Sequence, residues 1–320
     1  MIALWQGSAN QWDCDEMGHM NVRVYVEKAM EGLGTFAHAI HMPHAFESEA
    51  LSTLIPVDQH IRFLREVHPG RPLTMNGCVL EVGDTELVLY QELRHADGAP
   101  AAAFRTRLIH AEAKSAKPFA WSARTRKALE ALIEVAPTDT LPRSIQPDGP
   151  SRSIDKISKD IALANNAPRI GMGTVPASHC DRHGRMQTEW FMGRISDSVP
   201  NLLYAWRNAV AKAAGDNRTG GAVLEYRLKY HAYPEAGDLF EAYSSFARAE
   251  EKFHSLVHWL IDPVTGKPWL TSEVVAVTFD LDTRKIIKTQ PEHVEILKNC
   301  LLYTSPSPRD QRGSRMPSSA

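Results

Sequence analysis

The chain has 320 residues, of which 43% are hydrophobic and 23% are charged, with a formal net charge of -2. This length accommodates two domains of ordinary size, each with its own core. The near-neutral charge argues against a nucleic-acid partner, and no acidic block marks a solvating tail. The cysteines lack any paired spacing, so we expect reduced thiols of a cytosolic protein at Cys14, Cys78, Cys180 and Cys300.

Neither the N-terminus nor any internal segment predicts membrane insertion. The first residues contain too few consecutive apolar side chains for a secretory signal. No apolar run approaches the roughly 20 residues that span a bilayer. We therefore expect a soluble, cytoplasmic protein without a membrane partner. Residues 299–320 are rich in Ser, Pro and Arg, have no apolar period, and are expected to be a disordered or artefactual tail.

The first half of the chain predicts a short strand, one long helix and then several strands. Apolar residues in segment 21–40 recur near the 3.6-residue period of a helix. The segments that follow alternate in polarity and contain β-branched and aromatic residues, as half-buried strands do. The expected strands cover residues 60–66, 73–82, 86–94 and 101–110.

The second half predicts the same order of elements. A helix is expected over residues 188–214, with a kink or break at Pro200. The expected strands cover residues 222–230, 239–250, 252–261 and 269–280. Between the halves, a proline-rich stretch indicates a linker. The expected domains are residues 1–135 and 168–298, joined by a linker at 136–167 and followed by the tail at 299–320.

An internal repeat underlies this similarity between the halves. The stretch C-D-E-M-G-H-M at residues 14–20 matches C-D-R-H-G-R-M at residues 180–186 in its Cys, Asp, Gly and Met positions. Three further matches follow in the same order and at nearly the same offset, pairing segments that begin at Ile61, His68 and Asp97 with those at Tyr226, Tyr233 and Thr265. One helix followed by uninterrupted strands in each repeat predicts an α+β fold with an antiparallel sheet.

The first copy of the motif resembles the 4-hydroxybenzoyl-CoA thioesterase branch of the hotdog superfamily. That branch has an aromatic residue, D-x-D, a glycine, and a helix with a tyrosine and an acidic residue. The matching positions are Trp12, Asp13, Asp15, Gly18, Asn21, Tyr25 and Glu27. The form Gly18-His19-x-Asn21 is similar to the acyl-CoA thioesterase subset. The resemblance covers residues 1–125 and 168–290 and implies a double hotdog, each half a long central helix wrapped by an antiparallel sheet.

The chemistry of thioester hydrolysis suits these residues. A carboxylate before a helix can act as nucleophile or general base, which makes Asp15 the principal catalytic candidate. Free N–H groups of the first helical turn can stabilise the oxyanion. The resemblance implies that this donor is a backbone N–H near Val22. The alternative role for Asp15 is that of a turn or helix-capping residue.

The neighbouring polar residues each have two possible roles. His19 either positions water or the thioester, or makes a hydrogen bond within the loop. Asn21 either takes part in catalysis or caps the helix. We expect Asp13 and Glu27 to be structural.

The second copy departs from the pattern. Asp181 is retained and is the secondary catalytic candidate, whereas Arg185 replaces His19 and is expected to attract carrier phosphates. Gln187 and Gly193 stand where the first copy has Asn21 and Glu27. Because hotdog sites form where two units meet, each copy is expected to contribute to the other's site.

The expected activity is hydrolysis of an acyl-CoA thioester, without metal or other cofactor. An acyl-carrier protein is an alternative carrier, and the protein can be a monomer or a homo-oligomer. The cluster from His179 to His183 lacks a second ligand pair at zinc-site spacing, so no metal is expected there. Two alternatives remain open. One is a hydratase or dehydratase on an acyl carrier, which would use a His paired with an acid. The other is a non-catalytic acyl-CoA or acyl-carrier binding module.

Overall fold

The fold is described from a computed structural model. The model describes residues 1–151, 157–214, 219–280, 283, 285–288 and 291. Residues 299–320, expected to form the tail, lie outside the described residues.

In chain order, the first half has a strand, then a long helix, and then a run of strands. Its elements are β1 (Ile2–Ser8), η1 (Gln11–Asp13), α1 (Val22–Ala39), β2 (Ser52–Phe63), β3 (Pro72–Val82), β4 (Glu86–His95), β5 (Pro100–Glu112), α2 (Ala123–Ala131) and η2 (Thr138–Thr140). The remaining elements are α3 (Lys159–Ala164), β6 (Arg169–Thr174), η3 (Ala177–His179), α4 (Thr188–Ala214), β7 (Thr219–Tyr230), β8 (Leu239–Ala249), β9 (His254–Ile261) and β10 (Pro268–Asp280).

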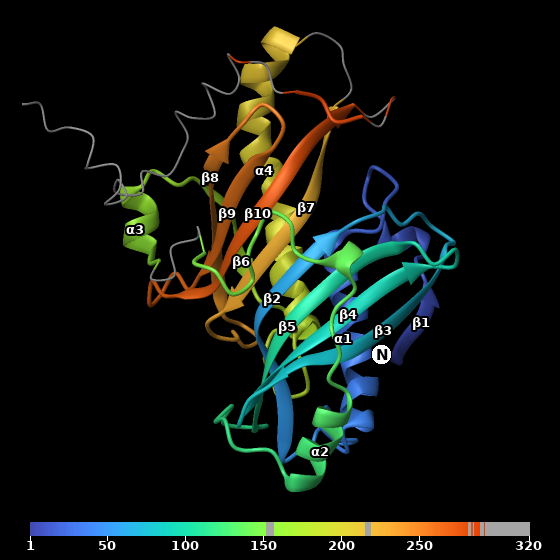
Figure 1. Ribbon diagram of the computed structural model, residues 1–320. Helices are drawn as coiled ribbons and strands as arrows, with labels where there is room; N and C mark the ends of the chain where they lie inside the picture. Colours follow the sequence, from blue (N-terminus) through green and yellow to red (C-terminus); the bar gives the residue numbers. More distant parts are fainter. Residues whose placement is uncertain (152–156, 215–218, 281–282, 284, 289–290, 292–320) are drawn as a thin grey trace, which may run out of the picture.

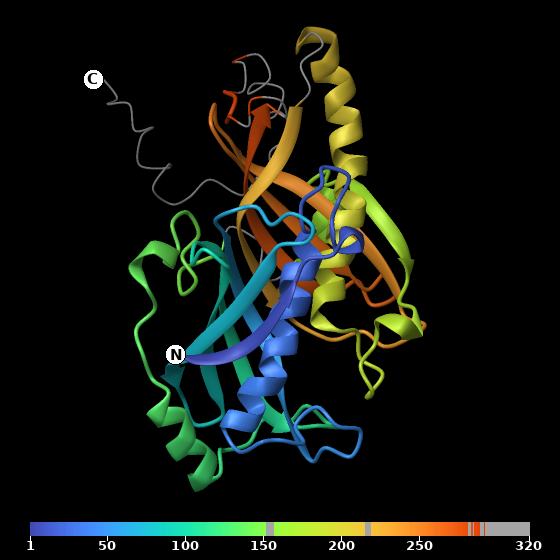
Figure 2. The same ribbon diagram turned by 90° about the vertical axis from the view of Figure 1, so that its right-hand side faces the viewer.

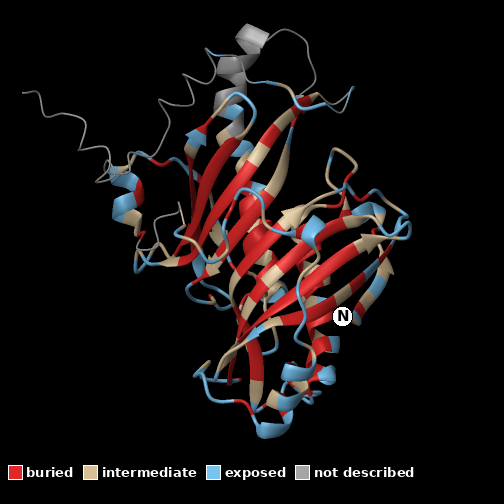
Figure 3. Cartoon of the chain, in the orientation of Figure 1, coloured by how far each residue is buried: buried red, intermediate tan, exposed pale blue. Residues whose placement is uncertain are grey.

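All ten strands form one antiparallel sheet, in the order β1-β3-β4-β5-β2-β7-β10-β9-β8-β6. From each outer edge of the sheet to its centre, the strands of each half follow one another in the same order. The strands of the two halves join where β2 pairs with β7, from Asp58–Lys229 to Arg62–Glu225. The predicted α+β class with an antiparallel sheet is confirmed. Figure 3 shows buried residues along the strands on both sides of this junction.

The two long helices lie against one face of the sheet (Figure 1). Figure 2 shows that α1 and α4 run in opposite directions from neighbouring starting points near the middle of the molecule. There the Arg23 guanidinium lies 4.6 Å from the centre of the Trp190 ring. A Cβ at Gly193 would lie only 3.0 Å from Arg23 Cδ, so glycine permits this close approach. None of the described helices is both long and apolar enough to cross a membrane.

The buried apolar side chains of α1 explain why this helix packs against the sheet. Val24, Ala29, Leu33 and Phe36 lie on its buried face, as the helical period predicted. Halfway along the helix, Gln91 Nε2 donates a 2.8 Å hydrogen bond to the Ala29 carbonyl and so links α1 to β4.

The predicted helix limits agree with α1 and α4 within one residue. Helix α4 continues through Pro200, so the break that was one of the two expectations at this residue does not occur. Strand β2 begins at Ser52 rather than at His60, so its first part was missed. This first part contains Pro56, a residue that argues against a strand. Pro56 lies at a register shift and before the segment that pairs with β7, so its missing N–H is tolerated. The short helix α2 was also missed.

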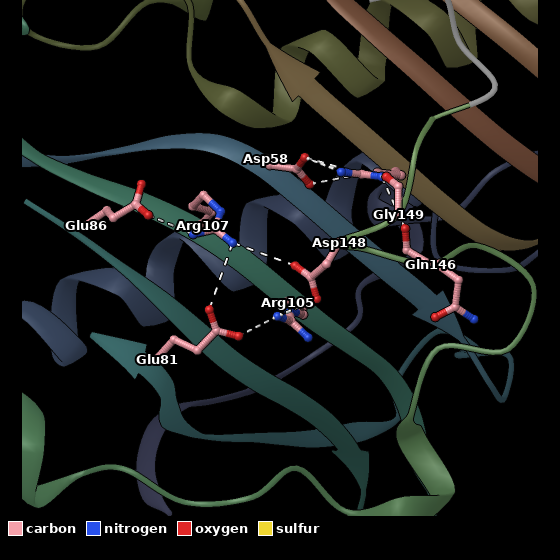
Figure 4. A network of polar contacts seen from close by, with 9 residues as sticks. Asp58, Glu81, Glu86, Arg105, Arg107, Gln146, Asp148 and Gly149 are labelled. Atoms are coloured by element: carbon pink, nitrogen blue, oxygen red, sulfur yellow. Dashed lines mark hydrogen bonds and ion pairs between the residues drawn. The ribbon is translucent and has the colours of Figure 1, made fainter. Parts of the chain in front are cut away.

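The opposite face of the sheet carries the segment that connects the halves (Figure 1). Arg227 forms an ion pair with Asp58 and donates hydrogen bonds to the carbonyls of Gln146 and Gly149. Figure 4 shows Asp148 beside Arg105 and Arg107, with 2.9 Å between Asp148 Oδ2 and Arg105 Nη2. These residues enclose a small polar cavity of about 260 Å³.

Glu225 is the second anchor of this segment. Its carboxylate is 2% exposed and accepts hydrogen bonds from the backbone N–H groups of Arg143, Ser144 and Ile145. His60 Nε2 lies 3.4 Å from the same carboxylate. Burial alone would raise the pKa of Glu225, but the hydrogen bonds from His60 and the backbone lower it below its ordinary value. The segment is therefore fixed across the central strands.

Candidate active site

The two copies of the motif form loops with the same hydrogen bonds. Asp15 Oδ1 accepts from the N–H groups of Met17 at 2.9 Å and His19 at 3.2 Å. Asp181 Oδ1 accepts from those of His183 at 2.8 Å and Arg185 at 3.0 Å. The turn role that was the alternative prediction for Asp15 is therefore present, and Asp181 makes the same contacts; in each residue these hydrogen bonds go to one carboxylate oxygen. The Asp181 Oδ2 atom lies 3.4 Å from Arg185 Nε.

Glycine closes each loop. Gly18 and Gly184 have φ angles of +76° and +83°, a region that other residues rarely adopt. Each loop is followed by the start of a long helix, and a backbone hydrogen bond of 2.8 Å fixes this connection. Asn21 N–H donates to the Asp13 carbonyl, and Gln187 N–H donates to the His179 carbonyl.

The helix starts provide unpaired backbone donors. Asn21 caps α1, and its side chain accepts a 2.9 Å hydrogen bond from Arg23 N–H. The N–H groups of Val22 and Thr188 make no hydrogen bond within the part of the chain that the structure describes. Such first-turn donors can hold a developing oxyanion.

A cavity of about 920 Å³ lies between the two halves. Its apolar wall includes Met30 and Leu33 of α1 and Leu54 of β2. The loop of Asp181 and the first turn of α4 also line the cavity. Among the residues predicted as catalytic, Asp181 lines this cavity, whereas Asp15, His19, Asn21 and Val22 are not among the lining residues.

In the sequence, His183 stands out only as a potential metal ligand. It lines the cavity, and its buried Nε2 atom has no hydrogen-bond partner among the described residues. A buried nitrogen without a partner is costly unless something binds it, so this atom can accept or donate a proton within the cavity. The repeat could not indicate it, because the first copy has Met17 at this position.

Glu189 was missed entirely. It lies in the first turn of α4, lines the cavity and is only 8% exposed. Burial raises its pKa, and the nearby Glu27 adds to the shift. A buried carboxyl group with a raised pKa is a candidate general acid or base. In the sequence it resembles any acidic residue near a helix start.

The rim of the cavity is charged and aromatic. Arg182 and Arg185 lie on the side of the Asp181 loop. Trp12, which is 81% exposed, lines the opposite side. Glu27 also lines the cavity and forms an ion pair with Arg23 on the same helix. These charges are suited to the polar part of an amphipathic ligand whose apolar part contacts α1.

His179 is engaged in packing. Its ring stacks on Trp190 with 3.4 Å between ring centres, and its Nδ1 atom lies 2.7 Å from Arg194 Nη2. Burial and the Arg194 charge lower its pKa.

Near the first-copy loop, the described residues place His19 beside Glu66, with 3.3 Å between His19 Nε2 and Glu66 Oε2. His19 is 7% exposed, and its partner Glu66 lies outside the motif loop.

Part of the first half of the chain is similar to a known protein family. Residues 9–129 match the family model of the thioesterase-like superfamily. A search of curated protein sequences finds no significant match.

Solved structures extend the similarity to most of the chain. An acyl-ACP thioesterase from Bacteroides thetaiotaomicron shares 15% identity with a TM-score of 0.61, covering 85% of this chain and 96% of its own. A protein described as an oleoyl thioesterase from Lactobacillus plantarum shares 11% identity with a TM-score of 0.63, covering 85% and 94%. A 12:0-ACP thioesterase from Umbellularia californica shares 9% identity with a TM-score of 0.64, covering 86% and 93%. The chain therefore has a hotdog-like thioesterase fold.

Proposed function

We propose that this protein is a thioesterase that hydrolyses an acyl-CoA thioester to a carboxylic acid and free CoA. We also propose that it is a double hotdog, with units at residues 1–135 and 168–298 joined by residues 136–167. The observation that carries the activity is the cavity of about 920 Å³ in which Asp181, His183, Glu189 and the start of α4 face an apolar wall from α1 and β2.

The geometry suggests a role for each group. The acyl chain would lie along Met30, Leu33 and Leu54. The carbonyl oxygen would accept a hydrogen bond from Thr188 N–H, where negative charge develops during attack. Asp181 would remove a proton from the attacking water, or it would attack the carbonyl carbon itself and form a mixed anhydride that water then hydrolyses to the free acid. As the C–S bond breaks, a proton from His183 or Glu189 would neutralise the leaving thiolate.

The residues that line the cavity decide which of the two aspartates we propose as the principal catalytic residue. The motif alone favoured Asp15, with Val22 N–H as oxyanion donor and with His19 and Asn21 beside it. We now propose the Asp181 site as principal because Asp181 lines the large cavity. Asp15 and Val22 remain the candidates for a second, related site at the start of α1.

One observation favours the hydratase or dehydratase alternative, namely the pairing of His19 with Glu66. Such chemistry requires a His paired with an acid. However, neither residue is among those that line the large cavity, so thioester hydrolysis is the stronger proposal.

The test is a substrate panel. Purified protein should release free thiol from acyl-CoA or acyl-carrier-protein thioesters of different chain length, as followed with a thiol reagent. Comparison of the two carriers identifies the preferred one. Absence of thiol release above background across the panel would contradict the proposal and favour a binding module, while water addition to an enoyl thioester would support the hydratase alternative.

A further inference from the structure

We propose that His19, Glu66 and His68 form a binding site for a divalent transition-metal cation of the zinc class. Their candidate ligand atoms all lie within 4.8 Å of one another. His19 Nε2 lies 3.3 Å from Glu66 Oε2, and His68 Nε2 lies 3.9 Å from the same oxygen. No residue of this cluster lines the large cavity.

The donor set and spacing suit zinc. Two imidazole nitrogens and one carboxylate oxygen are a known zinc ligand set that leaves a fourth position for water. With metal–ligand distances of about 2.0–2.2 Å, neighbouring ligands of a tetrahedral site lie about 3.3–3.5 Å apart. The 3.3 Å separation of His19 Nε2 from Glu66 Oε2 has this value, and the 3.9 Å separation of His68 Nε2 from the same oxygen exceeds it by about half an ångström. Glu66 and His68 are about half exposed and therefore have room for the small rotations required.

A second observation concerns the orientation of His68. Its Nδ1 atom lies 3.2 Å from the Gly18 carbonyl oxygen. A carbonyl only accepts hydrogen bonds, so Nδ1 carries the hydrogen, and the neutral ring then has its lone pair on Nε2, the atom that approaches Glu66. Metal-binding histidines typically donate their other N–H to a carbonyl or carboxylate in this way.

The backbone holds the three ligands together. Met20 N–H donates a 2.8 Å hydrogen bond to the Val67 carbonyl, which joins the loop of His19 to the segment of Glu66 and His68. The rings of His19 and His68 meet edge to face, 5.0 Å apart. Little chain entropy would therefore be lost when a metal binds.

The second copy of the motif has a permanently charged side chain at the position that corresponds to His19. Met186 N–H donates an equivalent 2.7 Å hydrogen bond to the Pro234 carbonyl, but Arg185 stands where the first copy has His19. The Arg185 guanidinium lies beside Asp181. A metal on His19 would place positive charge on the loop that carries Asp15, as Arg185 does on the loop of Asp181.

Metal binding by the full-length protein tests this proposal directly, without any activity assay. After removal of metal with a chelator, Zn²⁺ should bind with a stoichiometry near one per chain in a calorimetric titration. Co²⁺ should give the visible absorption of a four-coordinate site. His68→Ala and Glu66→Gln should each weaken Zn²⁺ binding at least about tenfold. His44→Ala is the matched control, because His44 and Glu47 form an exposed pair at 2.9 Å elsewhere on the surface.

Unchanged Zn²⁺ affinity in both His68→Ala and Glu66→Gln, or no binding by the wild type, would overturn the site. Circular dichroism and thermal unfolding of the metal-free variants must match the wild type, so that lost binding is not lost folding. Since His68 and Glu66 are half exposed, both variants are expected to fold.

Discussion

Asp15 and Asp181 each use one carboxylate oxygen, Oδ1, to hold a loop, and the second oxygen of Asp181 lies beside the Arg185 guanidinium. Asparagine retains an oxygen that can accept the loop hydrogen bonds, so replacing either aspartate with asparagine separates this role from the proposed catalytic one.

Asp181→Asn should lower kcat at least about 100-fold while the fold is retained, because the amide can neither remove a proton nor attack the thioester. Asp15→Asn should cost less, since Asp15 is not among the residues lining the large cavity. Thiol-release kinetics would measure both, with Asp197→Asn on the exposed side of α4 as control. Wild-type turnover in Asp181→Asn would refute its catalytic role.

His183→Ala should reduce kcat about 10- to 100-fold, because the leaving thiolate would lose a proton donor inside the cavity. Steady-state kinetics of the variant with a thioester of low thiol pKa should show a smaller loss, since such a thiolate leaves without protonation. An equal loss with both substrates would indicate that His183 has another role.

Glu189→Gln tests the raised pKa of Glu189, which results from burial and then from Glu27. A carboxyl group with a raised folded-state pKa stabilises the fold below its unfolded pKa, and this contribution is lost as the pH rises through the raised value. From about pH 4 to pH 7, the wild type should therefore lose free energy of unfolding relative to Glu189→Gln. Urea unfolding at several pH values measures this difference, and a difference that does not change with pH would contradict it.

At this scale, the motif predicted the local geometry of the loop, but it did not indicate which side chains line the large cavity. The turn role of Asp15, the cap at Asn21 and the glycine at position 18 follow from short-range spacing, and the structure contains all three. Whether a side chain reaches the cavity depends on how α1 and α4 meet. That meeting depends on contacts such as Arg23 with Trp190, which no local pattern indicates.

The strands and helices were predictable where the hydrophobic period was uninterrupted. Helix α1 and strands β3 and β4 agree with the predicted limits within one residue. The start of β2 was hidden by Pro56, and α2 has only two buried residues, Thr125 and Leu129, too few to give a helical period. The proline-rich composition of the linker likewise did not indicate that it would be anchored by Glu225.

Glu225→Gln should lower the free energy of unfolding by about 2–3 kcal/mol, because the amide NH₂ would face backbone donors in a buried site. Glu81→Gln is the control, since Glu81 is 55% exposed and its ion pair with Arg105 should contribute less than about 1 kcal/mol. Chemical denaturation of the two variants should separate these values. Equal losses would show that the linker is not anchored as described.

At the scale of the whole molecule, the cavity needs both halves. Its apolar wall includes residues of α1 and β2, while the proposed catalytic groups Asp181, His183 and Glu189 come from the second-copy loop and α4. The β2–β7 pair holds these parts in one continuous sheet. Because both halves belong to one sheet, the apolar wall and the proposed catalytic groups keep fixed positions relative to each other.

Met30→Phe tests the contribution of α1 to acyl-chain selection. The larger ring should fill part of the cavity and lower kcat/KM for long acyl chains at least about tenfold, with little change for short chains. Met30 is only partly buried, so the fold should tolerate the ring. Leu163→Phe, at an exposed position on α3, should leave the chain-length profile unchanged. The same profile in both variants would argue that the chain lies elsewhere.

The most direct test of the proposed site is a crystal structure with a non-hydrolysable thioether analogue of an acyl-CoA. We predict that its acyl chain lies between α1 and the start of α4, with the position of the thioester carbonyl near Thr188 N–H and the Asp181 carboxylate. An analogue bound away from both the Asp181 and Asp15 loops would contradict the account.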